Sequence, residues 1–358
     1  MTHATALIVA GGTGGHIFPG LSVAKMLLAN NWQVKWVGNP NAMEGQLVLQ
    51  HGIALCPLVF SGFRGKSLLE QILMPFKLVR AFYQAFQIIQ QQKPQVVLGM
   101  GGYVAFPLCV MAHLFNIPLV IHEQNSVPGL TNRVLAKLTK HVLTAFPRVF
   151  KHSQWVGNPV RQEISQQPLP EIRYQNRSGP LRVLVVGGSL GAKALNDVLP
   201  NALALIPKSL RPEVVHQTGR QHLEEVQSKY VAKDLQVECV AFIDNMAEAM
   251  AQADLLICRA GAMTVAEVAA LGVAALFIPY PFAVDNHQTQ NAQFLVREDA
   301  AWMILQSELT ARGLAGWLES IDRFACLDKA NKARAIAKTR STELVVEIME
   351  KVAVKDEA

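Results

Sequence analysis

Short apolar runs alternate with longer helical patterns along almost the whole chain of 358 residues. Because continuous apolar runs suit strands that are buried on both faces, the pattern favours parallel sheets covered by helices. In the first half we predict strands at Ala6–Ala10, Gln33–Val37, Ile53–Phe60, Val96–Leu98, Leu119–His122 and Val142–Leu143. Between them we predict helices near Leu21–Ala29, Leu68–Gln91, Val104–Phe115 and Leu130–Thr139. This alternation predicts a doubly wound α/β domain.

The pattern stops between Pro147 and Pro180 and then starts again. That stretch holds five prolines and a polar run, which predicts a linker or hinge. After it we predict strands at Leu181–Val186, Glu213–Gln217, Gln236–Ala241, Leu255–Cys258 and Ala274–Ile278. The tail from about Ser320 is predicted to be helical, with no further strand. The restart, like the length of the chain, favours two domains.

Each half opens with a strand that runs directly into a glycine-rich loop, Gly11–His16 in the first and Gly187–Ala192 in the second. Such a loop lets the backbone approach a phosphate at a helix N-terminus, and the alternative is a tight turn that needs glycine only for its φ. Two such units predict two Rossmann-like domains with parallel sheets that face a shared cleft, each holding one substrate. Ile17 stands where a nicotinamide-dinucleotide fingerprint needs glycine, so that cofactor is not expected.

Composition narrows the classes of partner. The 33 Lys and Arg against 27 Asp and Glu give a charge of +6 without a dense basic run, so nucleic-acid binding is not expected. An anionic substrate or a membrane surface remains open. The five cysteines form no C-x-x-C pair and fit reduced core residues of a cytoplasmic protein. No signal peptide, Asp-x-Asp pair or zinc-type histidine spacing is found.

A long uncharged stretch lies within the first half. No Asp, Glu, Lys or Arg lies between Lys93 and Glu123, a length that could span a bilayer. Glycines and prolines interrupt this stretch where a strand, loop, helix and second strand would need them. We therefore predict a buried part of an α/β sheet, with a membrane span at residues 94–121 as the alternative.

Polar residues at strand ends are the candidates for chemistry. His16 closes the first glycine loop, where it is either a general base for a substrate hydroxyl or a surface or capping residue. Glu123 follows an apolar strand and is a second candidate base, or a cap of the next helix. Glu267 follows the strand Leu255–Cys258 and could bind a ribose diol, or be an ordinary first-turn glutamate.

These features together resemble one known family. The matching segments are Gly11–His16, Gly99–Tyr103, His122–Asn125, Gly157–Arg161, Gly187–Ala192 and Arg259–Glu267. In this order and combination they are similar to the MurG family of bacterial glycosyltransferases. Members add N-acetylglucosamine from UDP-N-acetylglucosamine (UDP-GlcNAc) to undecaprenyl-pyrophosphoryl-N-acetylmuramyl-pentapeptide (lipid I) and give lipid II for peptidoglycan. The resemblance implies the GT-B fold and an enzyme that needs neither a metal ion nor a cofactor.

The resemblance also implies a division of the chain and a set of site residues. It assigns residues 1–160, joined by a C-terminal helix at about 340–358, to the acceptor and membrane, and residues 161–339 to the donor. The implied UDP-GlcNAc contacts are Thr13, Gly14, Gly15, Asn125, Arg161, Ser189, Ile243, Ala262, Met263, Thr264, Val265, Ala266, Glu267 and Gln288. The implied reaction is inverting transfer to the muramyl 4-hydroxyl. From their positions alone, His16 is the expected base and Glu123 the second choice.

A lipid-linked acceptor implies contact with a membrane surface. Within Leu68–Phe86 the apolar residues Leu69, Ile72, Leu73, Phe76, Val79, Phe82 and Phe86 recur at helical spacing, with Arg64, Lys66, Lys77 and Arg80 nearby. Such a helix either lies on an anionic membrane or packs on its own sheet. A peripheral position at the cytoplasmic face of the inner membrane is expected, with cell-wall and division proteins as candidate partners. The alternative functions are a glycolipid synthase, a UDP-GlcNAc 2-epimerase or a non-catalytic nucleotide-binding or membrane-adaptor protein.

Overall fold

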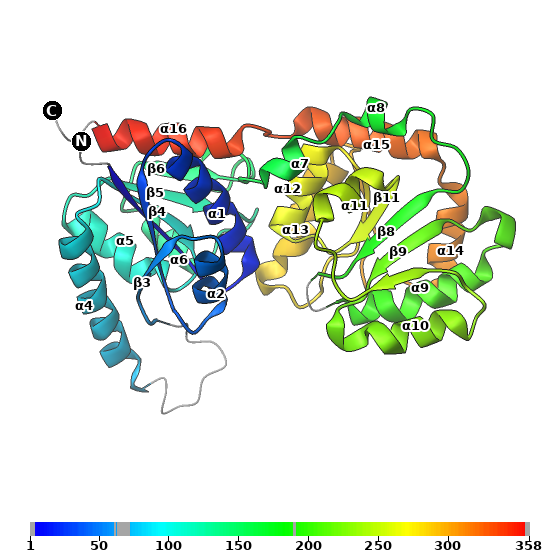
Figure 1. Cartoon of the computed structure of the whole chain (residues 1–358), viewed down its shortest axis with the longest axis horizontal. Coiled ribbons are helices and arrows are strands. Elements are labelled where there is room, and N and C mark those ends of the chain that lie inside the picture. The colour runs from blue at the N-terminus through cyan, green and yellow to red at the C-terminus, as the bar shows by residue number, and fades with distance from the viewer. Residues whose placement is uncertain (1–3, 61, 63–71, 189–190, 355–358) are drawn as a thin grey trace. The chain divides into compact units, whose positions relative to one another are not determined.

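The computed structural model describes residues 4–60, 62, 72–188 and 191–354. The chain forms two compact units (Figure 1), of which unit 1 comprises Met1–Arg161 and Lys338–Ala358. Unit 2 comprises Gln162–Ala337. The last segment of the chain therefore returns to the unit in which the chain began.

Unit 1 is built on a parallel sheet. Its described strands are β1 (Thr5–Ala10), β2 (Gln33–Gly38), β3 (Ala54–Pro57), β4 (Val96–Gly101), β5 (Leu119–Glu123), β6 (His141–Thr144) and β7 (Gln154–Trp155). They lie in the order β3-β2-β1-β4-β5-β6-β7. This is the Rossmann order, in which ligands bind beyond the carboxyl ends of the strands where the order reverses. That point lies between β1 and β4.

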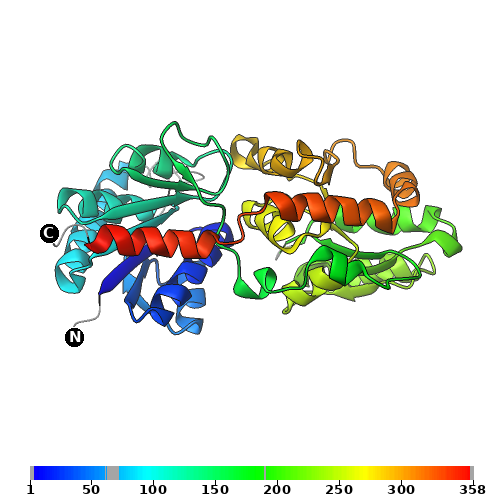
Figure 2. The same ribbon diagram turned by 90° about the horizontal axis from the view of Figure 1, so that it is seen from above.

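Helices cover both faces of this sheet. The described helices of unit 1 are α1 (Gly14–Ala29), α2 (Met43–Gln50), α4 (Met74–Gln92), α5 (Ala105–Leu114), α6 (Leu130–Leu135) and α16 (Ser341–Val354). Along β1, Ile8 packs into the core formed with α1 and α16, whereas Leu7 packs into the core formed with α4 and α5. The red helix α16 runs across unit 1 in both views (Figures 1 and 2), and it packs beside α1. Burial on both faces explains why β1 is apolar throughout.

Unit 2 repeats the architecture. Its described strands are β8 (Arg182–Val186), β9 (Glu213–Gln217), β10 (Glu238–Val240), β11 (Leu255–Cys258), β12 (Ala274–Phe277) and β13 (Trp302–Met303), in the order β10-β9-β8-β11-β12-β13. The helices are α7 (Gln162–Ser165), α8 (Pro170–Tyr174), α9 (Lys193–Leu205), α10 (Leu223–Val231), α11 (Met246–Gln252), α12 (Ala262–Leu271), α13 (His287–Val296), α14 (Ala311–Ser320) and α15 (Arg323–Ile336), with 3₁₀ turns at Lys208–Leu210, Arg220–His222 and Val284–Asn286. All its strand pairs are parallel.

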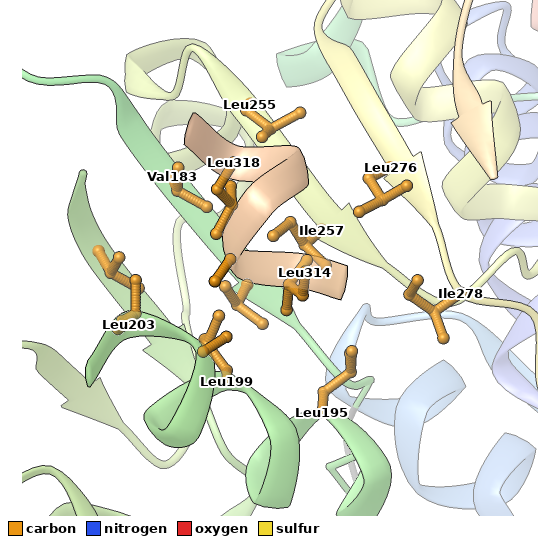
Figure 3. Close-up of a cluster of buried hydrophobic side chains, with 14 of the residues drawn as sticks. Val183, Leu195, Leu199, Leu203, Leu255, Ile257, Leu276, Ile278, Leu314 and Leu318 are labelled. Carbon is orange, nitrogen blue, oxygen red and sulfur yellow. The ribbon is translucent and has the colours of Figure 1, made fainter. Parts of the chain in front are cut away.

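The core of unit 2 lies between its sheet and two helices (Figure 3). Leu199 of α9 and Leu314 of α14 point toward the sheet, where they meet Val183 of β8 and Ile257 of β11. All four side chains are almost completely buried. Close packing of this kind fixes the strands, and thereby the loops at their carboxyl ends.

The predicted fold class is confirmed: both units are α/β with parallel sheets. The helix predicted from Leu21 in fact begins at Gly14, because the glycine loop leads directly into it and it accommodates Pro19. Helix α2 and the two-residue edge strands β7 and β13 were not predicted. Segments as short as these edge strands carry no periodic signal of their own.

The proline-rich stretch between Pro147 and Pro180 is more ordered than a linker. The boundary between the units falls within it, but most of it folds onto unit 2 as α7 and α8. Arg173 and Arg177 hold it there, because both guanidinium groups donate to the Ala251 carbonyl, at 3.2 and 2.7 Å. The prediction of a linker is therefore wrong for the part after Arg161.

The uncharged stretch before Glu123 forms β4, α5 and β5, as predicted. In the part of the chain that the structure describes, no helix is long and apolar enough to cross a membrane. All five cysteines are unpaired thiols, and four of them are buried while Cys239 is half-buried. Their predicted place in the core is confirmed for those four.

Candidate functional site

A buried carboxylate accepts hydrogen bonds from the backbone of the first glycine loop and of the segment after β2. Glu44 accepts hydrogen bonds from the Asn39 N–H at 3.2 Å and the Gly12 N–H at 3.4 Å, and its side chain is almost fully buried. From the neighbouring strand, Gly102 approaches so closely that an added Cβ would lie 2.3 Å from the Gly11 carbonyl oxygen. The loops after β1 and β4 are thus packed backbone to backbone, which only glycine permits.

His16 lies in the first turn of α1, at the point where these two loops meet. Its Nδ1 is 3.1 Å from the Thr13 hydroxyl. A Cβ added to Gly101 would lie 3.0 Å from the His16 ring and 3.4 Å from the Asn132 amide nitrogen, so the imidazole and the amide flank this glycine. When Nδ1–H donates to Thr13, Nε2 carries the lone pair that a general base needs.

Glu123 holds the loop that follows β5. Its Oε1 accepts from the Asn125 N–H at 2.9 Å and from the Asn125 amide at 3.4 Å. Its Oε2 accepts from the Gly129 N–H at 3.1 Å and from the Asn132 amide at 2.9 Å. Burial raises the pKa of this carboxyl, and these hydrogen bonds only partly offset the rise. A buried carboxylate with four donors fixes the shape of the loop around it.

His122, the preceding residue, is a buried neutral imidazole. Its Nε2–H donates to the Gly157 carbonyl at 2.9 Å, and its Nδ1 accepts from the Gln124 amide at 3.1 Å. Burial lowers the pKa of His122 to about 4, against a weaker opposing effect of the Gly157 hydrogen bond. The residue therefore ties the end of β5 to the segment at Gly157 without carrying charge.

In unit 2, polar side chains gather where β11 and β12 end. The Gln288 Oε1 accepts from the Tyr280 N–H at 2.9 Å and from the Ala260 N–H at 3.2 Å. These bonds fix the amide so that its Nε2 is the atom left to donate outward. Helix α12 begins here, with Gly261 as its N-cap and without a side-chain cap, and its dipole favours a negative group at this end.

The predicted donor residues fall into three sets. Thr13, Gly14, Gly15, Asn125 and Arg161 lie in unit 1, whereas Ile243, Ala262, Met263, Thr264, Val265, Ala266, Glu267 and Gln288 lie in unit 2. Ser189 lies outside the described residues. Within α12 the side chains of Ala262 and Val265 are buried, so these two residues offer a ligand only their backbone. Met263, Thr264, Ala266 and Glu267 are partly exposed.

The sequence did not predict the structural roles of three residues at these edges. Gln217 is buried at the end of β9, and its amide joins the loops after β8 and β10. Arg259 donates to the Ile278 carbonyl at 2.9 Å and to the Gln306 side chain at 2.7 Å, which ties the ends of β11 and β12 to the segment after β13. Glu44 is the third. For Gln217 a signal existed, since it is a polar residue at the carboxyl end of a strand, as Glu123 is.

In the part of the chain that the structure describes, no group of three or more His, Cys, Asp or Glu side chains is arranged to hold a metal ion.

Comparison with known proteins gives a consistent set of similarities. Residues 6–144 match the glycosyltransferase family 28 N-terminal domain, and residues 182–348 match the family 28 C-terminal domain. The chain is 54% identical to a protein of Cupriavidus metallidurans, over 99% of this chain and all of that one, and 53% identical to one of Ralstonia nicotianae, over 96% and 95%. Both are named UDP-N-acetylglucosamine–N-acetylmuramyl-(pentapeptide) pyrophosphoryl-undecaprenol N-acetylglucosamine transferase. The crystal structure of Acinetobacter baumannii MurG matches with a TM-score of 0.85 at 39% identity, covering 97% of this chain and 99% of that one.

Proposed function

Because this chain belongs to the MurG family within glycosyltransferase family 28, we propose that the strand ends of unit 2 hold its nucleotide-sugar donor and that His16 activates its acceptor. The chain is an inverting glycosyltransferase. It moves N-acetylglucosamine from UDP-GlcNAc to the muramyl 4-hydroxyl of lipid I and so makes lipid II. The observation that carries this function is identity above 50% along nearly the entire chain to transferases of that name.

The donor is assigned to the carboxyl edge of the unit 2 sheet. The uracil meets the backbone at Ile243, Glu267 accepts from the ribose hydroxyls, and the fixed amide of Gln288 donates to the sugar. Support comes from the position of Glu267 within the second turn of α12 and from the two hydrogen bonds that orient Gln288. The departing diphosphate gains negative charge, which backbone N–H groups and helix N-termini at this edge stabilise.

The acceptor is activated from unit 1. The His16 Nε2 takes the proton of the muramyl 4-hydroxyl while that oxygen attacks the anomeric carbon. The bond from the anomeric carbon to the diphosphate breaks on the opposite face, and UDP leaves with the electron pair. Thr13 orients the imidazole through Nδ1. Glu123 becomes a positioning residue in this assignment, because its carboxylate is occupied by the loop that carries Asn125.

The test is UDP release and GlcNAc transfer with a lipid I analogue, with and without that acceptor. UDP release that depends on the acceptor supports transfer, whereas donor consumption without acceptor indicates an epimerase. The His16→Ala variant is expected to lose about 10²–10⁴-fold in kcat with its folding intact, the range of a general base. His113→Ala is the matched control, since His113 lies exposed at the end of α5. Unchanged turnover in His16→Ala would remove the base assignment and leave the transfer activity standing.

Membrane contact is assigned to the outer face of α4 and the residues just before it. Ile72, Phe76, Val79 and Tyr83 are 61–74% exposed, while Ala81, Ala85, Ile88 and Ile89 of the same helix pack inward. The helix thus buries one stripe and leaves a second, apolar stripe outward, beside Lys77 and Arg80. An apolar face with basic neighbours binds anionic lipid surfaces. With a lipid-linked acceptor, it supports a peripheral position at the cytoplasmic face of the inner membrane.

Two parts of the predicted membrane segment take no part in this assignment. Phe82 is half-buried and packs edge-on against Phe106 of α5, with ring centroids 6.0 Å apart, so it does not belong to the outer stripe. Arg64, Lys66, Leu68 and Leu69 lie outside the described residues.

Sedimentation with phosphatidylglycerol vesicles tests the membrane assignment. The double variant Phe76→Ser/Val79→Ser is expected to lose most vesicle binding and to keep its activity on a water-soluble acceptor analogue. Phe324→Ser is the matched control, since Phe324 of α15 is 79% exposed but lies in unit 2. Equal vesicle binding by the double variant and the wild type would refute the assignment.

A further inference from the structure

Gln217 makes two hydrogen bonds that no apolar or shorter side chain could reproduce. Its Nε2 donates to the Gly188 carbonyl at 3.0 Å, in the loop after β8. Its Oε1 accepts from the Ile243 N–H at 3.0 Å, in the segment after β10. Since a carbonyl can only accept and an N–H can only donate, the two partners allow one amide orientation. The side chain is 1% exposed, so these bonds are made away from water.

The first of the two segments that Gln217 connects, at Gly188, is held by further contacts. Its carbonyl also accepts from the Gly191 N–H at 3.0 Å, and Gly191 has a φ of +77°. A Cβ on Gly191 would lie 2.0 Å from the Thr218 carbonyl oxygen, so the two loops touch through their backbones. Asn196 of α9 donates to that same Thr218 carbonyl at 3.0 Å. Gly188 and Gly191 are therefore held to the end of β9 at several points.

The second segment, at Ile243, is held by fewer hydrogen bonds among the described residues. Ile243 follows β10, the edge strand of the sheet, which pairs with β9 only through Glu238–Val240. At the end of this pairing, the Thr218 N–H donates to the carbonyl of Val240, the last residue of β10, at 3.0 Å. The bond from the Ile243 N–H to Gln217 lies beyond this pairing and fixes the peptide between Phe242 and Ile243.

We propose that Gln217 is a positioning residue. It sets the spacing between the backbone at Gly188, which is assigned to the donor diphosphate, and the backbone at Ile243, which is assigned to the uracil. It touches neither group. The assignment rests on the proposed place of UDP-GlcNAc in unit 2. Because a nucleoside diphosphate must engage both segments at once, a side chain that fixes their separation lowers the cost of ordering them when the donor binds.

Three variants isolate this role. Gln217→Met keeps the volume but removes both bonds. Gln217→Glu keeps the acceptor for Ile243 when ionised and loses the donor to Gly188, whereas its protonated form restores both bonds. Val214→Ala is the matched control, since Val214 is a buried core residue of the same strand β9. All three are compared with the wild type by thermal unfolding, steady-state kinetics and calorimetric binding of UDP.

We expect Gln217→Met to raise the KM for UDP-GlcNAc and the Kd for UDP about tenfold, within the range for the loss of two buried hydrogen bonds. The KM for the lipid I analogue is expected to be unchanged. Gln217→Glu is expected to resemble the Met variant at pH 8 and to regain donor affinity, relative to wild type, toward pH 5. Val214→Ala is expected to unfold at lower temperature with the donor KM of the wild type.

The outcomes separate this inference from the function on which it rests. A wild-type protein that fails to bind UDP would overturn the donor site itself. Wild-type binding together with an unchanged donor KM in both Gln217 variants would overturn the positioning role alone. If Gln217→Met does not fold, a Gln217→Glu donor KM that shows no recovery at low pH also overturns the positioning role.

Discussion

Asp254 is a buried charge of unit 2 that forms ion pairs with two arginine side chains. Its side chain is fully buried, with Arg177 Nη1 at 2.6 Å from Oδ1 and Arg323 Nη2 at 3.1 Å from Oδ2. The Arg182 N–H donates to Oδ2 at 2.9 Å. Burial by itself would raise the pKa of Asp254, but the hydrogen bonds from Arg182, Arg177 and Arg323 outweigh it and hold the pKa below its usual value. Since a depressed folded-state pKa stabilises above the unfolded value, this contribution is present above about pH 4 and lost below it.

The Asp254→Asn variant leaves two largely buried guanidinium groups without their anion. Breaking such a pair costs about 3–5 kcal/mol. At about 2–4 °C per kcal/mol for a unit of this size, the Tm of unit 2 is expected to fall by roughly 6–20 °C. Asp254 precedes β11 and so lies at the amino edge of the sheet, opposite Gln217. For that reason kcat/KM at 20 °C is expected to stay within about twofold of the wild type.

Differential scanning calorimetry of wild type, Asp254→Asn and Asp197→Asn measures this effect. Asp197 is the control, because its ion pairs with Lys193 and Lys229 are partly exposed and such pairs contribute at most about 1 kcal/mol. A Tm for Asp254→Asn within about 2 °C of the wild type would show that the buried pairs do not stabilise unit 2. If the Tm falls as expected but kcat/KM falls far more than twofold, the amino and carboxyl edges of the sheet are coupled.

Two further predictions concern buried polar groups. Glu44→Ala removes the acceptor of the Gly12 and Asn39 N–H groups, so denaturant unfolding is expected to show a loss of about 2–4 kcal/mol, and kcat/KM a fall of about tenfold. A fully stable and active Glu44→Ala would contradict the role given to this carboxylate. Burial lowers the pKa of both His122 and His216 to about 4, so the unfolded chain binds more protons between about pH 6.5 and 4. Stability is expected to fall by up to about 3 kcal/mol per histidine as the pH drops through that window. His216→Met should show a shallower fall in urea titrations, and equal slopes would refute the assignment.

Much of the architecture was predictable from the sequence because it depends on local patterns. The apolar run of β1 predicted a strand buried on both faces, and the glycines after it predicted a turn into a helix. The second half repeats both signals at β8, which predicted the second sheet. Patterns of this kind record burial, and burial fixes the sheets.

The side chains that connect the loops were not predictable in the same way. Glu44 lies in the first turn of α2, where an acidic residue needs no explanation beyond the helix dipole. Only the fold brings it beneath the loop after β1. Glu123 was found by its place at a strand end, but its proposed role changed once its partners were known. A sequence shows which residues reach a sheet edge, whereas their partners come from strand order.

The position of UDP-GlcNAc in a crystal structure of the complex is the most direct test of the donor assignment. We expect the nucleotide at the carboxyl edge of the unit 2 sheet, with the uracil against the Ile243 backbone and the ribose hydroxyls within hydrogen-bonding distance of Glu267. A nucleotide bound at any other edge or face of the protein would contradict the assignment.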